Sequence, residues 1–166
     1  MKGANTIMKT HRFSVWPLLF AISILGSSSS AAAVLLPGEQ APPIAVTDGQ
    51  GNSVSLDIPS TNSLLLVFIK PGDRYTSETL HALDRVLNEY PPLAAKIDPT
   101  IIISRSSGAP DGGEVAITVS DRWRILWDMK DQTYRSYKII ATPTVVLVGS
   151  NGTIEAVNPG YDTDMS

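Results

Sequence analysis

The sequence predicts an α/β fold in which a central mixed sheet is flanked by helices. Strongly apolar runs, such as residues 64–69, are short and typical of strands buried on both faces of a sheet. Between 80 and 90, apolar residues recur at helical spacing, so a helix follows that strand. Near the end of the chain, Asn151-Gly152 separates two β-rich runs, which predicts a tight hairpin and makes the sheet mixed.

The remaining elements follow in chain order. A first hairpin is expected at 44–56, with its bend at Asp48-Gly49, before the buried strand at 62–70. The helix ends at Pro91-Pro92, because proline lacks an N–H and disfavours helix in the residue before it. Thereafter we expect a buried strand (100–104), a loop (105–114), a segment whose alternation favours a strand or strand-like turn (115–123), a short strand (124–129), a short helix (131–139) and the terminal hairpin (142–157).

The first 33 residues have the three-part layout of a secretory signal. A basic start is followed by an apolar run at 13–25 and by three alanines that end at Ala33. We expect cleavage after Ala33, which leaves a Pro-rich lead-in at 34–43 and a domain at 44–166; an uncleaved N-terminal anchor is the alternative. The apolar run is shorter than the roughly 18 residues that a membrane-spanning helix needs, so no stable span is expected after cleavage.

Composition excludes several classes of function. Cleavage removes three of the 13 basic residues and none of the 16 acidic ones, so the net charge changes from −3 to −6. An acidic domain argues against nucleic acid or an anionic membrane as the partner. The chain has no cysteine, and His81 is the only histidine outside the signal, so neither a metal site nor a cofactor is expected.

Three local patterns, in this order, resemble the thioredoxin superfamily. PGEQAPPIAVTDGQGNSVSL (37–56) is similar to the opening of exported thioredoxin-like proteins and of the redoxin group, which includes alkyl hydroperoxide reductase and thiol-specific antioxidant proteins. LLLVFIKPGDRYTSETLHAL (64–83) resembles the strand, loop and helix that carry the family's Cys-x-x-Cys motif. YKIIATPTVVLVGSNGTI (137–154) resembles the segment in which a threonine and a cis-proline begin a strand. The resemblance implies a thioredoxin-like fold over nearly all of the mature chain.

Two departures from the family bear on function. Aligned on the strand, the two cysteine positions fall on Asp73 and Thr76, and a peroxiredoxin alignment instead places Thr79 at the reactive position. Thiol–disulfide exchange and peroxide reduction both need a thiolate, so the resemblance implies a redox-inactive relative without a catalytic residue. The nine residues after Val157 are too few for the family's C-terminal helix, which leaves a sheet face for a partner or a second copy, or indicates a truncated chain.

Two interpretations of the loop after the buried strand remain open. By resemblance, Tyr75, Thr142 and Pro143 line a groove that holds an extended peptide, and the residue before the cis-proline pairs with that peptide like an added strand. The alternative is that the loop only caps the helix, where a side-chain oxygen satisfies a backbone N–H group. The candidate caps are Asp73, Thr76 and Ser77.

Other candidate sites have a sufficient structural explanation. Asp111 and Glu114 lack the spacing of an EF-hand, so a solvated loop is expected rather than a calcium site. Asn151-Gly152-Thr153 matches a glycosylation sequon, and a tight turn also explains it. The aromatic and basic stretch at 122–138 is expected to pack in the core and at its rim; a surface for an acidic partner is the alternative.

These observations favour an exported, redox-inactive thioredoxin-like domain, periplasmic or extracellular, that binds a protein or peptide partner in the cell envelope. An enzyme is the less favoured interpretation, because the chemistry of the fold needs a cysteine. Two alternatives stay open: an accessory of a thiol–disulfide or peroxide oxidoreductase system with a cysteine-bearing partner, and a truncated, inactive relative. Oligomerisation through the uncovered sheet face is a further option.

Overall fold

Strand β3 lies near the middle of a seven-stranded sheet, with all its side chains from Leu64 onward buried. The computed structural model describes residues 35–105 and 117–160, which fall within one compact unit. Its strands are β1 (Val46–Thr47), β2 (Ser53–Val54), β3 (Ser63–Ile69), β4 (Ile97–Ser104), β5 (Arg124–Asp128), β6 (Thr144–Val148) and β7 (Ile154–Pro159). Its helices are α1 (Thr76–Glu89), α2 (Pro91–Ala94) and α3 (Gln132–Ser136).

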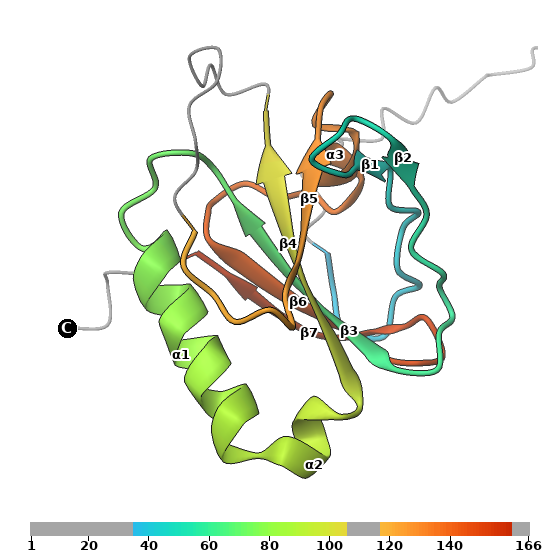
Figure 1. The fold of residues 1–166 in the computed structure, drawn as a ribbon. Coiled ribbons are helices and arrows are strands. Elements are labelled where there is room, and N and C mark those ends of the chain that lie inside the picture. Colours follow the sequence, from blue (N-terminus) through green and yellow to red (C-terminus); the bar gives the residue numbers. More distant parts are fainter. Residues whose placement is uncertain (1–34, 106–116, 161–166) are drawn as a thin grey trace, which may run out of the picture. The chain divides into compact units, whose positions relative to one another are not determined.

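The sheet is mixed, as the sequence predicted, and its order is β2-β1-β5-β4-β3-β6-β7 (Figure 1). Strands β3, β4 and β5 are parallel, and α1 makes the crossover between β3 and β4 that a parallel pair requires. The antiparallel hairpins β1–β2 and β6–β7 form the two edges. Strand β6 runs antiparallel to β3, so the end of β3 lies beside the start of β6, with Phe68 opposite Thr144.

Side chains alternate between the two faces of β3 and create two cores. Leu65, Val67 and Ile69 pack beneath α1, where Leu80 and Leu87 cover them. On the opposite face Phe68 meets Tyr134 of α3 and Tyr137, which directly follows α3, with ring centroids 5.3 Å apart in both pairs. Helix α2 was not expected, but proline at a helix start loses no hydrogen bond, so Pro91 begins a new turn where α1 ends.

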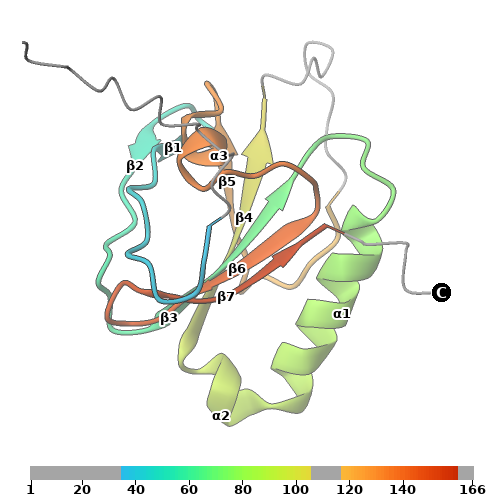
Figure 2. The ribbon, with the colours of Figure 1, turned by 180° about the vertical axis from the view of Figure 1, so that it is seen from behind.

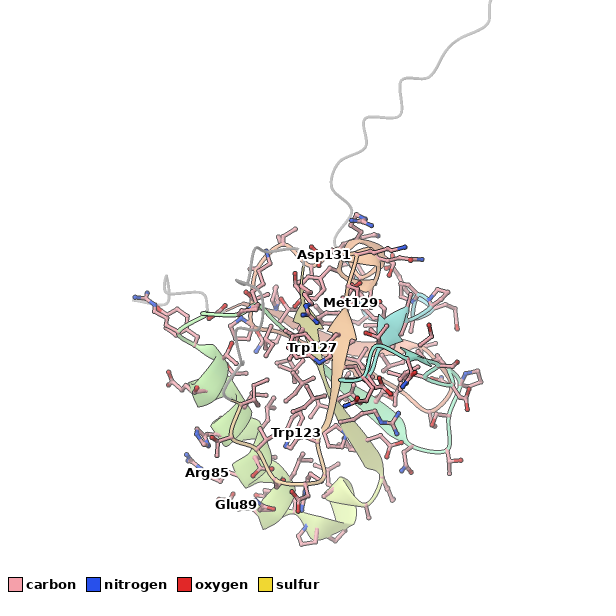
Figure 3. All side chains as sticks on the ribbon, turned by 45° about the horizontal axis from the view of Figure 1, so that its top comes forward. Arg85, Glu89, Trp123, Trp127, Met129 and Asp131 are labelled. Carbon is pink, nitrogen blue, oxygen red and sulfur yellow. The ribbon has the colours of Figure 1, made fainter. Side chains whose placement is uncertain are left out.

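For the segment 115–123 a strand or a strand-like turn was expected, and its described residues, 117–123, form no strand but include a turn closed by the Trp123 N–H and the Ser120 carbonyl (3.1 Å). The segment packs beside α1, where Asp84 accepts hydrogen bonds from the Ser120 hydroxyl (2.6 Å) and the Trp123 indole (3.0 Å). Figure 3 shows Trp123 between α1 and β5. A carboxylate on the helix therefore holds this segment over the sheet.

The described part of the lead-in is joined to the terminal hairpin (Figure 2). The Gly38 N–H donates to the Ile154 carbonyl, and the Ile154 N–H donates to the Glu39 carbonyl, both at 2.8 Å. Leu35 is only 4% exposed and belongs to the core beneath α3. This segment is therefore part of the folded domain.

Several expectations from the sequence concern residues that the structure does not describe. The secretory signal, the loop with Asp111 and Glu114, and the segment after β7 all lie there. Among the described residues, no helix has both the length and the apolar character needed to cross a membrane.

Candidate functional site

The loop between β3 and α1 is a compact turn. The Asp73 N–H donates to the Lys70 carbonyl (3.2 Å), and the Thr76 N–H reaches the Asp73 carbonyl (3.4 Å) as the helix begins. Gly72 has a φ of +80°, a conformation that side-chain-bearing residues rarely adopt. Glycine at this position therefore allows the chain to turn from the strand end into α1.

Asp73 links this loop to the segment that precedes β6. One carboxylate oxygen accepts the Tyr75 N–H at 2.9 Å, and the other accepts the Thr142 hydroxyl at 2.7 Å. The second bond joins residues 69 positions apart in the chain. Asp73, which the sequence resemblance aligned with the family's first cysteine, is thus a carboxylate that fastens two loops together.

The capping interpretation is wrong for two of its three candidates. Helix α1 starts at Thr76, and its cap position, Tyr75, makes no side-chain capping bond. The Thr76 hydroxyl oxygen is buried and has no hydrogen-bond partner among the described residues, so it does not cap either. No described hydrogen bond involves the Ser77 hydroxyl, whereas Asp73 binds the N–H just before the first turn.

Arg74 covers the ring of Tyr75. Its guanidinium carbon lies 4.5 Å from the ring centroid, and the same group donates a hydrogen bond to the tyrosine hydroxyl. A cation over an aromatic face is attracted by the ring's electron density. The two side chains therefore form one unit on the outer side of the loop.

Pro143 lies at a groove between α1 and the β6–β7 hairpin. The Thr142–Pro143 peptide bond is cis, and Pro143 is buried. The groove has a volume of about 290 Å³. Its lining residues are Glu78, Thr79, Ala82, Leu83, Pro143, Val145, Asn158 and Gly160. Of the three groove residues expected from sequence, Pro143 lines this cavity and Thr142 and Tyr75 do not.

The side chain and the backbone of Thr142 differ in whether they are already hydrogen-bonded within the domain. Its hydroxyl is used by Asp73, while its backbone N–H and carbonyl make no hydrogen bond to another described residue. Gly160 completes this corner: a side-chain carbon there would lie 3.0 Å from the Cβ of Ala141. These two segments therefore approach closely just before β6 begins at Thr144.

Thiols and metal ligands are two kinds of reactive group that enzymes place at such a site. The chain has no thiol, and the described residues contain no cluster of three His, Cys, Asp or Glu side chains that would hold a metal ion. His81 is exposed on α1. Ser104, at the end of β4, donates its hydroxyl to Asp131 at 2.7 Å, which is a structural contact. What the arrangement offers is shape and backbone hydrogen bonding.

The aromatic and basic stretch separates into core and surface. Burial raises the pKa of both Tyr134 and Tyr137 well above that of a free phenol. The Tyr134 hydroxyl donates to the carbonyls of Ile69 and Ile102, so it supports the ends of β3 and β4. The cations of this stretch are all exposed: Arg122, Arg124, Lys130, Arg135 and Lys138. The aromatic rings therefore serve packing, as expected.

Two acidic residues that sequence reasoning missed hold elements in place. Asp128, 1% exposed, accepts the backbone N–H groups of Gln132 and Tyr134 at 2.9 Å and so caps α3. The Ser120 hydroxyl is the main cause that lowers the pKa of Asp84 from its ordinary 3.8, against a smaller opposing effect of burial. Asp128 lies three residues before the expected helix start, and an aspartate just before a helix is a sequence signal for a cap.

No protein-family model and no curated protein matches the sequence. Among solved structures, the thioredoxin domain of a thiol-disulfide oxidoreductase from Bacteroides vulgatus is similar with a TM-score of 0.58 and 23% identity, over 75% of this chain and 89% of that one. A putative thiol:disulfide interchange protein DsbE from Chlorobium tepidum is similar with a TM-score of 0.60 and 20% identity, over 78% and 89%. StoA from Bacillus subtilis is similar with a TM-score of 0.53 and 15% identity, over 72% and 88%. Identities this low establish the fold alone, which is thioredoxin-like, as the sequence predicted.

Proposed function

We propose that this cysteine-free, thioredoxin-like domain binds an extended segment of a protein partner at the edge formed by Thr142 and Pro143. The observation that carries the proposal is the use of Asp73: its carboxylate ties the loop to Thr142 instead of presenting a reactive group. The Thr142 backbone then remains available for strand-like pairing with a peptide. The neighbouring groove would accept one apolar side chain of that peptide.

The lining of the groove supports an apolar anchor. Leu83 and Val145 are partly buried against the core beneath α1, and Pro143 is buried beside them. Glu78 and Asn158 place polar atoms on the rim. Apolar walls with a few polar groups are typical of cavities that bind a side chain.

We further propose that the domain acts after export, in the periplasm or outside the cell. The support is the three-part layout of residues 1–33. Expression of the full chain with a C-terminal tag in a bacterium, followed by N-terminal sequencing of the exported product, tests this. Export predicts a product that begins at Val34, whereas an intact N-terminus in the cytoplasm would refute it.

Selection from a random-peptide display library tests binding. The bait is the chain from residue 34 onward, which contains all the described residues, and bound peptides are then measured against two variants. Asn158→Arg places a long cation over the groove from β7. Ser150→Arg makes the same kind of change in the exposed turn of the same hairpin, away from the groove, and is the matched control.

The proposal expects peptides with a shared apolar residue that lose at least about tenfold in affinity for Asn158→Arg and keep their affinity for Ser150→Arg. Peptides that bind both variants equally would place binding elsewhere on the domain. Failure to enrich any peptide would refute the binding function at this edge. Dithiol–disulfide activity of the pure chain would refute the redox-inactive assignment.

A further inference from the structure

Helix α1 carries an apolar stripe on a side that does not pack on the sheet. Ala82, Val86 and Tyr90 follow one another at four-residue spacing, so they lie in one row along the helix. Val86 is 43% exposed and Tyr90 is 58% exposed. Leu93, in the neighbouring helix α2, is 46% exposed as well. Single exposed apolar residues are common, but a contiguous row of them marks a surface that a partner covers.

Two opposite charges border this stripe along one edge. Arg85 and Glu89 each precede a stripe residue by one position, so they form a second row one turn apart. Figure 3 shows both side chains on the outer side of α1. Both are exposed, and neither bonds to another described residue.

We infer that the stripe is the contact surface for a second copy of this chain, with the two α1 helices packed antiparallel. A two-fold axis brings the same surface of both copies together, so residue i of one meets residue j of the other, and the reverse. In an antiparallel pair each edge of a stripe meets the same edge of the other copy. Arg85 therefore lies opposite Glu89 of the second copy, and this ion pair forms twice.

The apolar residues fit the same register. An axis level with Val86 places Val86 next to Val86 of the second copy, and it leaves Arg85 and Glu89 of the second copy about 3 Å apart along the helix direction, which two long side chains can bridge. It also places the large Tyr90 beside the small Ala82 of the second copy, so a bulky side chain meets a gap. A parallel pair would instead set the charged edge against the opposite edge of the stripe, where Leu83 and Thr79 offer no countercharge.

A helix pair of this length buries less surface than a standard interface, so the dimer is weak and reversible. Ala82 belongs both to the stripe and to the lining of the groove, so the test changes only Arg85 and Glu89, which do not line the groove, and its failure is distinguishable from failure of the proposed function. The variants are Arg85→Glu and Glu89→Arg, each of which sets like charges against each other twice across the axis. Ser77→Glu adds a charge to the same helix two turns before Arg85, at an exposed position that does not line the groove, and is the matched control.

Sedimentation equilibrium of the chain from residue 34 onward, at concentrations on the order of 10–500 µM, measures the dimer dissociation constant. Each single variant is expected to raise that constant on the order of tenfold, while Ser77→Glu leaves it unchanged. An equimolar mixture of Arg85→Glu and Glu89→Arg is expected to form a heterodimer, because the charges are complementary again. Thermal melts verify that every variant is folded.

Three results would overturn the inference. The first is a folded wild-type chain that stays monomeric over the whole concentration range. The second is a dimer that both charge variants form as well as the wild type does, which would place the contact elsewhere. The third is a mixture of the two variants that dimerises no better than either variant alone.

Discussion

The hydrogen bond between Thr142 and Asp73 supports the proposed site, and its removal gives the most informative prediction. Thr142→Val keeps the shape of the side chain and deletes the hydroxyl that donates to the carboxylate at 2.7 Å. A hydrogen bond to a charged group contributes about 1.5–3 kcal/mol to folding. Both residues are only half-buried, so water compensates part of the loss and we expect about 1 kcal/mol. In a domain of this size that lowers Tm by about 3–6 °C.

A double-mutant cycle separates this bond from other effects of the substitutions. Urea unfolding of wild type, Thr142→Val, Asp73→Ala and the double variant is followed by tryptophan fluorescence, since Trp123 is buried in the core. We expect an interaction energy of about 1 kcal/mol, and no comparable loss for Thr61→Val, an exposed threonine. An interaction energy indistinguishable from zero would refute the view that Asp73 fastens the loop to the strand.

Two further predictions concern the supports of the sheet. Asp84→Asn should lower Tm at pH 7: because its pKa is lowered in the folded state, Asp84 stabilises the domain above its ordinary pKa of 3.8, and that contribution is lost as the pH falls through the lower folded pKa. Melting curves of wild type and variant should therefore converge at acidic pH, and a constant difference would contradict the assignment. Tyr134→Phe should reduce the free energy of unfolding by about 1–3 kcal/mol, since it deprives two buried carbonyls of their hydroxyl donor. Chemical denaturation measures this loss, and an unchanged midpoint would show that the hydroxyl is dispensable.

The strands were predictable because their signal is local. A strand buried on both faces needs an unbroken apolar run, and β3 and β4 show one in the sequence alone. The terminal hairpin was predictable for a similar reason: the turn around Gly152, with its φ of +85°, needs a residue that tolerates this conformation. Patterns of neighbouring residues in the sequence were therefore sufficient to predict these elements.

The ties between elements were not predictable, because they join residues far apart in sequence. The helical pattern in the sequence predicts that Asp84 faces solvent. In the fold it accepts hydrogen bonds from Ser120 and Trp123, which are 36 and 39 positions away in the chain. Asp73 reads as a cap, yet its bond to Thr142 spans 69 positions. Asp131 looks like the cap of α3 but adopts a φ of 50°, and Asp128 takes that role. Short polar side chains can serve either local or distant partners, and only the fold decides.

Only the part of the candidate site that contiguous motifs encode could be predicted from the sequence. The pattern around Pro143 identified the strand start and the loop that faces it, because both belong to contiguous motifs. The groove itself draws half of its lining from α1 and the rest from Pro143, β6, β7 and Gly160. No local pattern specifies such a surface, and Tyr75, whose ring contacts Arg74, is not among its lining residues.

The most direct test of the account restores the missing sulfur atoms. The central claim is that Asp73 and Thr76 occupy the two positions of a redox loop in a thioredoxin-like fold. The two residues are joined by a turn with an N–H···O distance of 3.4 Å, and such turns hold Cα atoms within about 7 Å, the reach of a disulfide. The measurement is mass and free-thiol content of Asp73→Cys/Thr76→Cys after mild oxidation. The account predicts complete intramolecular disulfide formation in the folded monomer, whereas free thiols in a folded variant would contradict it.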